Sequence, residues 1–351
     1  MIPGRFFRSH LLCVAATLLA ISASITGWTT TAGAASKLGS QVTLYEATGA
    51  EPWFNYEIAK FEAKYHVHVN IVDTGSGVLL SRALLEKTHP EADVLVALPP
   101  FIEVAAEKGL LTPTHFKVEK TALPTTGKGY WYSLINNYEN FIYNPKVVKP
   151  APKSWKALLS SQFAGKISYS NPSEAGDGFA VLWVLQHEFG VKGAFDYLKQ
   201  LQANVEANPP GTGSQDALVS KGEVWVANGD VQMDLSDAAH GDNIKVWFPK
   251  DTKGQASTFS DPYAAGLVKN APNAAAGRAL LQFLFSKTAQ SKIPSLCYGL
   301  PGRTAIHPKS SVYDTWQKLL KGVKIFAVTW KDVVKEEPTL LKGWETKVQG
   351  S

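Results

Sequence analysis

The feature that most constrains this chain is a regular alternation of strand-like and helix-like segments, which begins at Gln41. Residues 41–45 (QVTLY) have the pattern of a strand, and residues 51–65 then place apolar side chains three or four positions apart, as on one helical face. The same two patterns recur in the strand 68–72, the helix 77–87, the buried strand 92–98 and the helix 100–109. Such alternation predicts an α/β fold with mainly parallel sheets covered by helices.

The rest of the chain continues in the same style. Strand patterns occur at 165–170, 223–228 and 244–248, and helix patterns at 178–190, 193–202, 214–222, 273–285 and 329–348. Two extended apolar segments, 136–145 (NNYENFIYNP) and 261–270 (DPYAAGLVKN), interrupt this scheme, and we interpret them as crossings between two lobes. The predicted division is residues 37–140 with 264–351 for lobe 1 and residues 141–263 for lobe 2. One larger domain is the alternative.

The N-terminus has the pattern of a secretory signal peptide. Arg5 and Arg8 precede the apolar run 11–23, and the small residues Ala32, Gly33 and Ala34 follow it. We therefore expect residues 1–34 to be a signal peptide cleaved near Ala34, and the protein to be periplasmic or extracellular. An uncleaved N-terminal anchor is the alternative. Cleavage would leave Cys297 as the single cysteine, so the sequence predicts no internal disulfide.

Charge and motifs narrow the function classes. The formal net charge is +5, and the charged residues are scattered rather than gathered in a basic run, which argues against nucleic-acid binding. The sequence contains no H-E-x-x-H metal motif, no G-x-x-x-x-G-K-[ST] phosphate loop and no G-x-S-x-G elbow. We therefore predict no catalytic residues, no metal and no cofactor. A secreted hydrolase of phosphonates or phosphate esters is the enzymatic alternative.

Several predicted strand-to-helix joints combine flexible glycines with hydroxyl side chains. The first N–H groups of a helix lack an intrahelical partner and lie at the positive end of the helix dipole, so such joints can bind an anion. In an open α/β sheet they gather at the carboxyl ends of the strands. Ordinary helix capping is the alternative for each joint. The residues concerned are Thr48 and Gly49; Thr74, Gly75, Ser76 and Gly77; Ser173, Gly176, Asp177 and Gly178; and Gly211, Thr212, Gly213 and Ser214.

Acidic residues accompany these joints. Asp177 lies between two glycines, where its carboxylate would repel a bound anion, so it either caps its helix or faces a cationic group. A ligand with an anionic head and an amine would suit such a mixture, and the acid that holds the amine is left open among Asp177, Asp230, Asp234 and Glu46. Further polar candidates are Asn228, Gln232 and Glu139, and the aromatic residues Tyr45, Trp53 and Tyr138 are expected to line a cleft.

Long stretches of the sequence resemble one family. Residues 75–111, 141–148, 152–183, 218–235 and 297–308 are similar to the extracellular solute-binding proteins of ABC importers, within the iron(III)-binding-like group. The motifs LPPFI, NPSEAGDG and VANGDVQM resemble most closely the subgroup that binds 2-aminoethylphosphonate, and the similarity runs from about Val42 to the end. The resemblance implies a type II periplasmic-binding-protein fold, with two lobes, a hinge of two crossing strands, and a ligand held in the cleft by closure.

The resemblance also implies the ligand and the partners. It predicts a monomer that delivers a small phosphonate, 2-aminoethylphosphonate, to an ABC permease and its ATPase. Iron binders of this group place a tyrosine pair just after the residue equivalent to Asn228, where this chain has residues 229–232 (GDVQ), so ferric iron is disfavoured. Polyamine and phosphate ester are further alternatives. The predicted ligand-binding residues are Tyr45, Thr48, Ser76, Gly77, Asn137, Tyr138, Gly176, Asp177, Gly178, Thr212, Ser214, Asn228 and Asp230.

Overall fold

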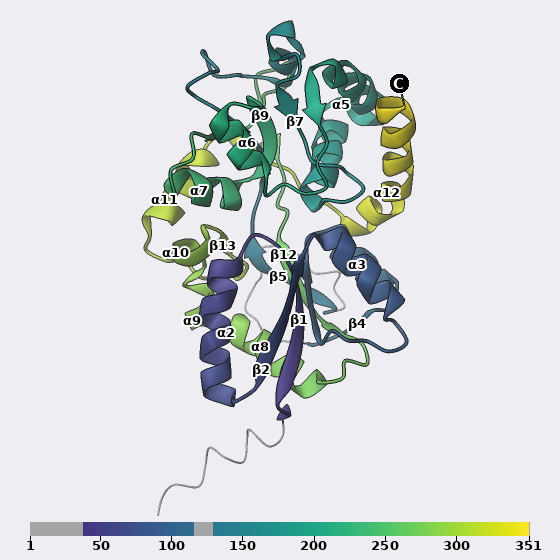
Figure 1. The fold of residues 1–351 in the computed structure, drawn as a ribbon, viewed down its shortest axis with the longest axis vertical. Helices are drawn as coiled ribbons and strands as arrows, with labels where there is room; N and C mark the ends of the chain where they lie inside the picture. The colour runs from purple at the N-terminus through teal and green to yellow at the C-terminus, as the bar shows by residue number, and fades with distance from the viewer. Residues whose placement is uncertain (1–37, 116–128, 351) are drawn as a thin grey trace, which may run out of the picture.

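The computed structural model describes residues 38–115 and 129–350, which form two lobes stacked end to end (Figure 1). The predicted signal peptide, residues 1–34, lies outside the described residues. Within the described ranges, no helix combines the length and the apolar character that crossing a membrane requires. Each lobe has its own β-sheet covered by helices, which agrees with the predicted α/β class.

The sheet of lobe 1 has the strand order β13-β5-β12-β3-β1-β2, and β4 pairs with β12. All four residues of β3 are buried, which explains why its sequence is a continuous apolar run rather than an alternating one. The strands are β1 (Gln41–Ala47), β2 (His68–Thr74), β3 (Val94–Ala97), β4 (Leu111–Thr112), β5 (Trp131–Asn136), β12 (Tyr263–Val268) and β13 (Leu300–Pro301).

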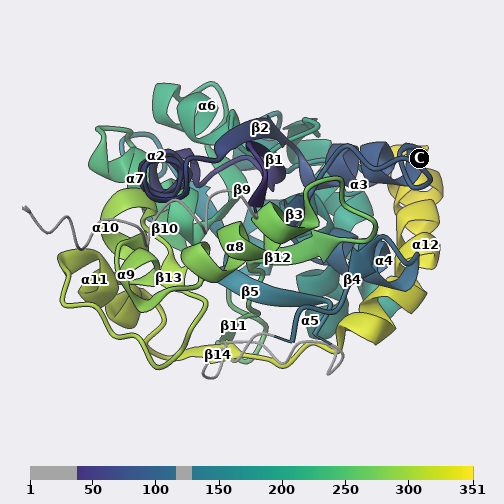
Figure 2. The same ribbon diagram turned by 90° about the horizontal axis from the view of Figure 1, so that it is seen from below.

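Helices cover both faces of this sheet (Figure 2). In α2, the side chains of Phe54, Ile58 and Phe61 recur every three or four residues and are all buried, so they form the apolar stripe that the sequence predicts. The helices of lobe 1 are α2 (Glu51–Tyr65), α3 (Ser76–Leu85), α4 (Phe101–Glu107), α8 (Ala274–Leu284), α9 (Lys287–Gln290) and α10 (Ile293–Cys297). Because β1, β2 and β3 are parallel, the joints that follow them all face lobe 2.

The sheet of lobe 2 has the strand order β10-β6-β9-β7-β8. The two helices predicted at 178–190 and 193–202 form one helical run, α5, which is broken locally at Gly190 (φ 70°). The elements of this lobe are β6 (Glu139–Tyr143), β7 (Ile167–Ser168), α5 (Gly176–Leu201), β8 (Val205–Ala207), α6 (Gln215–Lys221), β9 (Val226–Asp230), α7 (Val231–Ala239) and β10 (Lys245–Trp247), with short 3-10 helices at Trp155–Leu159, Ser161–Phe163 and Gln202–Asn204.

The prediction of mainly parallel sheets is wrong. In lobe 1, β12 is antiparallel to β3, β4 and β5, and β13 is antiparallel to β5. In lobe 2, β6 is antiparallel to both β9 and β10. The reason is that the chain passes between the lobes twice, so each sheet contains strands that leave or enter it against the direction set by its strand-helix-strand units.

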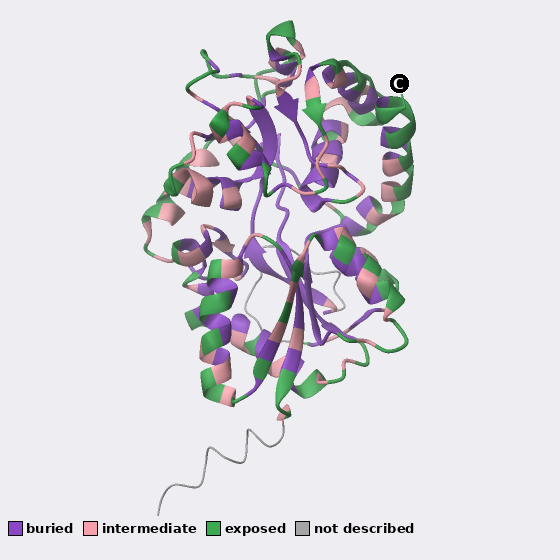
Figure 3. Ribbon diagram, in the orientation of Figure 1, coloured by how far each residue is buried: buried purple, intermediate pink, exposed green. Residues whose placement is uncertain are grey.

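The two crossings run side by side. The first lies at residues 137–138, between β5 and β6, and the second at residues 259–262, between β11 (Ala256–Thr258) and β12. A bridge pairs Tyr138 with Ser260, and Asp261 N donates to Asn137 O at 3.0 Å. Both crossings are buried between the lobes (Figure 3). They lie within or beside the two segments interpreted as crossings, 136–145 and 261–270.

The C-terminal segment contacts both lobes. It comprises α11 (Ser311–Leu319), β14 (Val323–Ile325), which pairs with β11, α12 (Trp330–Trp344) and a π-helix at Glu345–Gln349. Helix α12 contacts α4 and then runs along α5 (Figure 1), and Trp344 Nε1 donates to Tyr169 Oη at 2.9 Å. The segment thus bridges the lobes. The assignment of 37–140 and 264–351 to lobe 1 and of 141–263 to lobe 2 stays a prediction.

Candidate functional site

Two helix N-termini face each other where the lobes meet. Helix α3 begins after Gly75 and helix α5 after Ala175, and neither start has a side-chain cap. A Cβ atom on Gly77 would lie 3.1 Å from the Glu174 carbonyl oxygen of the other lobe, and one on Gly176 would lie 3.1 Å from Leu98 Cβ. Glycine is therefore what allows this close approach, and the positive ends of two helix dipoles converge here.

A buried polar network in lobe 2 holds the first turn of α5. The Asn228 amide oxygen accepts hydrogen bonds from Ser170 N (2.9 Å) and Gln215 Nε2 (2.7 Å). The Thr212 hydroxyl donates to Asp177 Oδ2 at 2.6 Å. The N-cap position of α5 is Ala175, so Asp177 is not the N-cap residue, although the sequence left a capping role open; its buried carboxyl is close enough to Glu139, Asp230 and Asp261 to act on their pKa values.

Four buried carboxyl groups cluster at this junction. Glu139 begins β6, Asp177 lies in the first turn of α5, Asp230 ends β9, and Asp261 lies in the second crossing; each is at most 8% exposed. Burial raises the pKa of all four carboxyls, and the negative charge of Asp177 raises further the pKa values of the other three. No Lys, Arg or His within residues 38–115 and 129–350 forms an ion pair with any of them.

Asp230 has a structural role within this cluster. Its Oδ1 accepts from Met233 N at 2.7 Å and caps α7, and its Oδ2 lies 3.5 Å from the Tyr263 hydroxyl. The two preceding N–H groups of this helix also have partners: that of Val231 donates to Tyr138 O at 3.1 Å, and that of Gln232 donates to Asn137 Oδ1 at 3.0 Å. Because its first turn is satisfied in this way, α7 contributes no free amides to an anion site.

The side chains of other predicted residues have partners away from the acids. The Tyr45 hydroxyl donates to Glu86 Oε1 (2.9 Å) beyond the far end of α3, and Tyr138 packs against Trp316. Thr48 is exposed and its hydroxyl donates to Asp73 Oδ1 at 2.6 Å, whereas its carbonyl oxygen lies 3.2 Å from the Tyr263 hydroxyl. Ser214 precedes α6 and makes no side-chain capping bond. The structure thus brings together Ser76, Gly77, Asn137, Gly176, Asp177, Gly178, Thr212, Asn228 and Asp230, but not the rings of Tyr45 and Tyr138.

Two further candidate acids belong to other neighbourhoods. Burial raises the pKa of Glu46 to about 9, and the charges that add to this rise are those of Asp73 and Glu51 in lobe 1. Asp234 accepts from Asn140 Nδ2 at 2.5 Å inside lobe 2. Trp53, a predicted cleft wall, instead lies in the core and donates to Ala289 O at 2.9 Å.

The sequence reasoning missed Asp261, Ser170, Gln215 and Tyr263. A signal for Asp261 existed, because it opens the segment interpreted as the second crossing, and an acid placed there must lie between the lobes. Ser170 follows β7, and Gln215 follows the loop that contains Thr212. Both side chains contact the Asn228 amide oxygen, which nothing in the sequence predicts.

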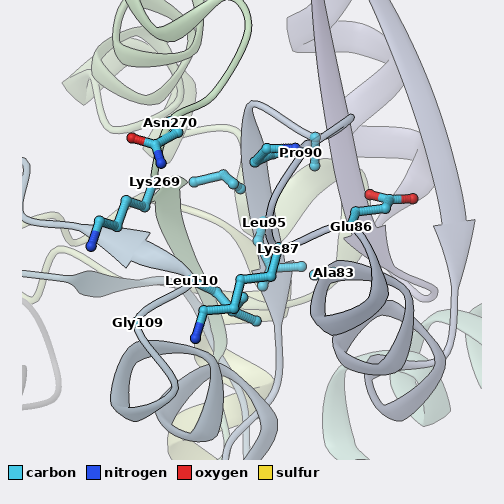
Figure 4. A pocket seen from close by; sticks show the side chains of 11 residues that line it. Ala83, Glu86, Lys87, Pro90, Leu95, Gly109, Leu110, Lys269 and Asn270 are labelled. Carbon is cyan, nitrogen blue, oxygen red and sulfur yellow. The ribbon is translucent and has the colours of Figure 1, made fainter.

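The lobes are in direct contact around the acids. Gln232 Nε2, in lobe 2, donates to Gly49 O, in lobe 1, at 2.6 Å, and the Tyr263 hydroxyl, at the start of β12 in lobe 1, lies 3.5 Å from Asp230 Oδ2, at the end of β9 in lobe 2. A separate surface cavity of about 90 Å³ lies at the opposite end of lobe 1 (Figure 4). It is lined by the end of α3, the start of β3 and the end of β12, and Lys87 and Lys269 stand at its rim. The acids are not part of it.

Residues 58–332 match the family described as bacterial extracellular solute-binding protein. The chain belongs to this family. A protein of Salmonella typhimurium (strain LT2) named "Putative 2-aminoethylphosphonate-binding periplasmic protein" is 38% identical over 318 residues, which cover 89% of this chain and 94% of the relative. "Iron uptake protein A1" of Synechocystis is 24% identical over 72% of this chain and 74% of its own length.

Solved structures share the fold at low sequence identity. The periplasmic binding protein AfuA from Actinobacillus pleuropneumoniae, solved with fructose-6-phosphate, superposes with a TM-score of 0.79 at 19% identity, covering 89% of this chain and 100% of AfuA. A periplasmic thiamin binding protein gives a TM-score of 0.75 at 18% identity, covering 88% and 96%. These structures confirm the predicted type II periplasmic-binding-protein fold, and the family confirms a solute-binding protein.

Proposed function

We propose that this protein is the periplasmic solute-binding component of an ABC importer and that it captures 2-aminoethylphosphonate between its lobes. The observation that carries the proposal is the pairing of opposite electrostatic features at one place. Two uncapped helix N-termini converge on the junction, and beside them lies a cluster of buried carboxyls that has no cationic partner among the described residues. A small molecule with a phosphonate at one end and an ammonium at the other matches both features. The relatives named for this ligand support the choice.

The phosphonate would lie between the starts of α3 and α5. Each start supplies N–H groups without an intrahelical partner, and the two dipoles approach from opposite lobes. The Ser76 side-chain oxygen accepts from Leu98 N at 3.1 Å, which leaves the hydroxyl hydrogen to donate to an anion. Donors from both lobes would then bind one group, so binding of the anion would favour closure.

Closure would strengthen the binding of so small a ligand. Hydrogen bonds to charged groups contribute about 1.5–3 kcal/mol each, and micromolar affinity corresponds to about −8 kcal/mol. Several such bonds, less the cost of association, would reach that value only where water is excluded. The direct contact of Gln232 with Gly49 and of Tyr263 with Asp230, each between residues of different lobes, supports a closed arrangement of this kind.

We infer that the exported protein is a monomer that hands its ligand to a membrane permease with a cytoplasmic ATPase, and that it binds the ligand without chemical change. Isothermal titration calorimetry against 2-aminoethylphosphonate, phosphoethanolamine, inorganic phosphate, putrescine and ferric citrate tests the ligand. The expected result is one-to-one binding that is tightest for 2-aminoethylphosphonate. Tighter binding of putrescine or ferric citrate would contradict it, and release of inorganic phosphate on incubation would support the hydrolase instead.

A further inference from the structure

The carboxyl groups at the lobe junction differ in what their oxygens contact. Both side-chain oxygens of Asp261 are buried and have no hydrogen-bond partner, and the same holds for Asp177 Oδ1 and Glu139 Oε2. In contrast, Asp230 Oδ1 accepts from Met233 N at 2.7 Å, and its Oδ2 lies 3.5 Å from the Tyr263 hydroxyl. The cluster therefore divides into one acid with a structural role and three with unused acceptors.

Unused buried acceptors on acids are costly. A buried carboxylate without a partner carries a large desolvation penalty, and buried polar atoms are in general hydrogen-bonded. The neighbouring charges do not relieve this penalty, because the groups that act on Asp261 are the acids Asp177 and Asp230. A cation that enters the junction would satisfy the three acids at once.

We propose that Asp261, Asp177 and Glu139 form a binding site for a primary ammonium group, and that Asp230 is not part of it. An ammonium group has three donors, and each of these three acids offers at least one oxygen without a partner. The inference deepens the proposed function and rests on it, since it assigns residues to the amine of the ligand.

The backbone around the three acids is fixed before any ligand enters. Asp261 N donates to Asn137 O at 3.0 Å, and the Thr258 hydroxyl donates to Glu139 O at 2.6 Å, so the two crossings hold each other. Asp177 is oriented by Thr212 through its other oxygen, Oδ2. The acceptors are thus preorganised, and this reduces the entropy lost when the ammonium group binds.

The test compares ligands with and without the amine. Calorimetry would measure the binding of 2-aminoethylphosphonate and of ethylphosphonate to the wild type and to Asp261→Asn. We expect the wild type to bind 2-aminoethylphosphonate at least 100-fold more tightly than ethylphosphonate. Asp261→Asn should weaken 2-aminoethylphosphonate binding by about 30-fold and leave ethylphosphonate binding unchanged or tighter, because a buried negative charge is removed.

Asp216→Asn is the matched control, because it neutralises a buried acid of lobe 2 outside the site, and it should leave both affinities unchanged. Thermal unfolding checks that each variant folds. Asp177→Asn should weaken 2-aminoethylphosphonate binding in the same way as Asp261→Asn, so it is the variant to test if Asp261→Asn does not fold.

The outcomes separate the amine site from the choice of ligand. The amine site is overturned if folded Asp261→Asn binds 2-aminoethylphosphonate with an affinity within threefold of the wild type. It is also overturned if the wild type binds the two phosphonates with equal affinity, or if it binds none of the probes. If the wild type binds putrescine but neither phosphonate, and Asp261→Asn loses putrescine, the amine site stands and the proposed phosphonate function fails.

Discussion

Two groups of buried acids in this protein resemble each other in composition and differ in surroundings. The junction group consists of Glu139, Asp177 and Asp261, which come from β6, from α5 and from the second crossing between the lobes. The lobe 2 group, Asp216 and Asp234, lies on the neighbouring helices α6 and α7 inside one lobe. Both groups are buried and rich in negative charge.

The difference lies in what can relieve the charge. In lobe 2, the carboxyls of Asp216 and Asp234 interact directly, so one proton shared between them removes the repulsion without any ligand. At the junction, the unused oxygens belong to three different elements, β6, α5 and the second crossing. The comparison teaches that a buried acid pair is satisfied by a proton, whereas acids gathered at a hinge are suited to a cation from outside.

The largest expected effect is on the pH dependence of stability, through Asp216. Burial, together with the charge of Asp237, raises its pKa from 3.8 to about 7. A folded-state pKa above the unfolded value gives stability that is full below about pH 4 and is lost as the pH rises through 7. Asp216→Asn should therefore raise the free energy of unfolding at pH 8 by on the order of 2–4 kcal/mol and change it little at pH 4.

Urea unfolding of the wild type and of Asp216→Asn at pH 4, 6 and 8 measures this effect. The asparagine amide can donate to Asp234, which would otherwise need the shared proton. Glu223→Gln, an exposed acid near the end of α6, is the control and should shift stability by less than about 0.5 kcal/mol at each pH. A gain for Asp216→Asn that is equal at pH 4 and pH 8 would show that its carboxyl is not the titrating group.

The second effect separates the two groups by function. Asp177→Asn and Asp216→Asn both remove a buried negative charge, so neither should destabilise the protein without ligand at pH 8. Only Asp177→Asn should weaken 2-aminoethylphosphonate binding, by about 10- to 100-fold, since it alone removes a charged acceptor at the junction. Calorimetry and urea unfolding of both variants measure this; equal losses of affinity would mean that the two groups are coupled.

Much of the fold follows from local sequence patterns. The stripe of Phe54, Ile58 and Phe61 predicts α2, and the break in α5 falls at Gly190, where the sequence ends one predicted helix. Strand direction does not follow in the same way. The antiparallel pairing of β12 with β3 depends on contacts between residues more than 160 positions apart, and the apolar run of β12 is compatible with either direction.

The site is less predictable than the fold for the same reason. Asp177 and Asp230 were both candidates for the acid that holds the amine, and the sequence could not tell which of the two carboxyls caps a helix. In the structure the Asp177 carboxyl accepts from the Thr212 hydroxyl, and the Asp230 carboxyl accepts from Met233 N. Tyr45 shows the converse case. It lies on a strand that ends at the junction, but its side chain runs towards Glu86, and the alternation of strand residues alone does not specify this.

A third prediction concerns the requirement for closure at the junction. Gly77→Ala would place a methyl group 3.1 Å from the Glu174 carbonyl of the other lobe, which is tighter than ordinary contact. The lobes could not approach fully, so 2-aminoethylphosphonate affinity should fall by about fivefold, or roughly 1 kcal/mol. Stability without ligand and its dependence on pH through Asp216 should be unchanged. Ala83→Gly, on the same helix away from lobe 2, is the control for the helix itself and should leave affinity unaltered.

The smallest effect is expected from the hydrogen bond that joins the lobes beside the acids. Gln232 Nε2 donates to Gly49 O at 2.6 Å, and Gln232→Ala removes this neutral bond, which contributes about 0.5–1.5 kcal/mol to the closed state. Affinity for 2-aminoethylphosphonate should fall by about threefold, mainly through faster dissociation, as stopped-flow measurement of tryptophan fluorescence would report. An unchanged dissociation rate would show that the ligand, held from both lobes, keeps them closed without this contact, and the acids and helix N-termini would then account for closure by themselves.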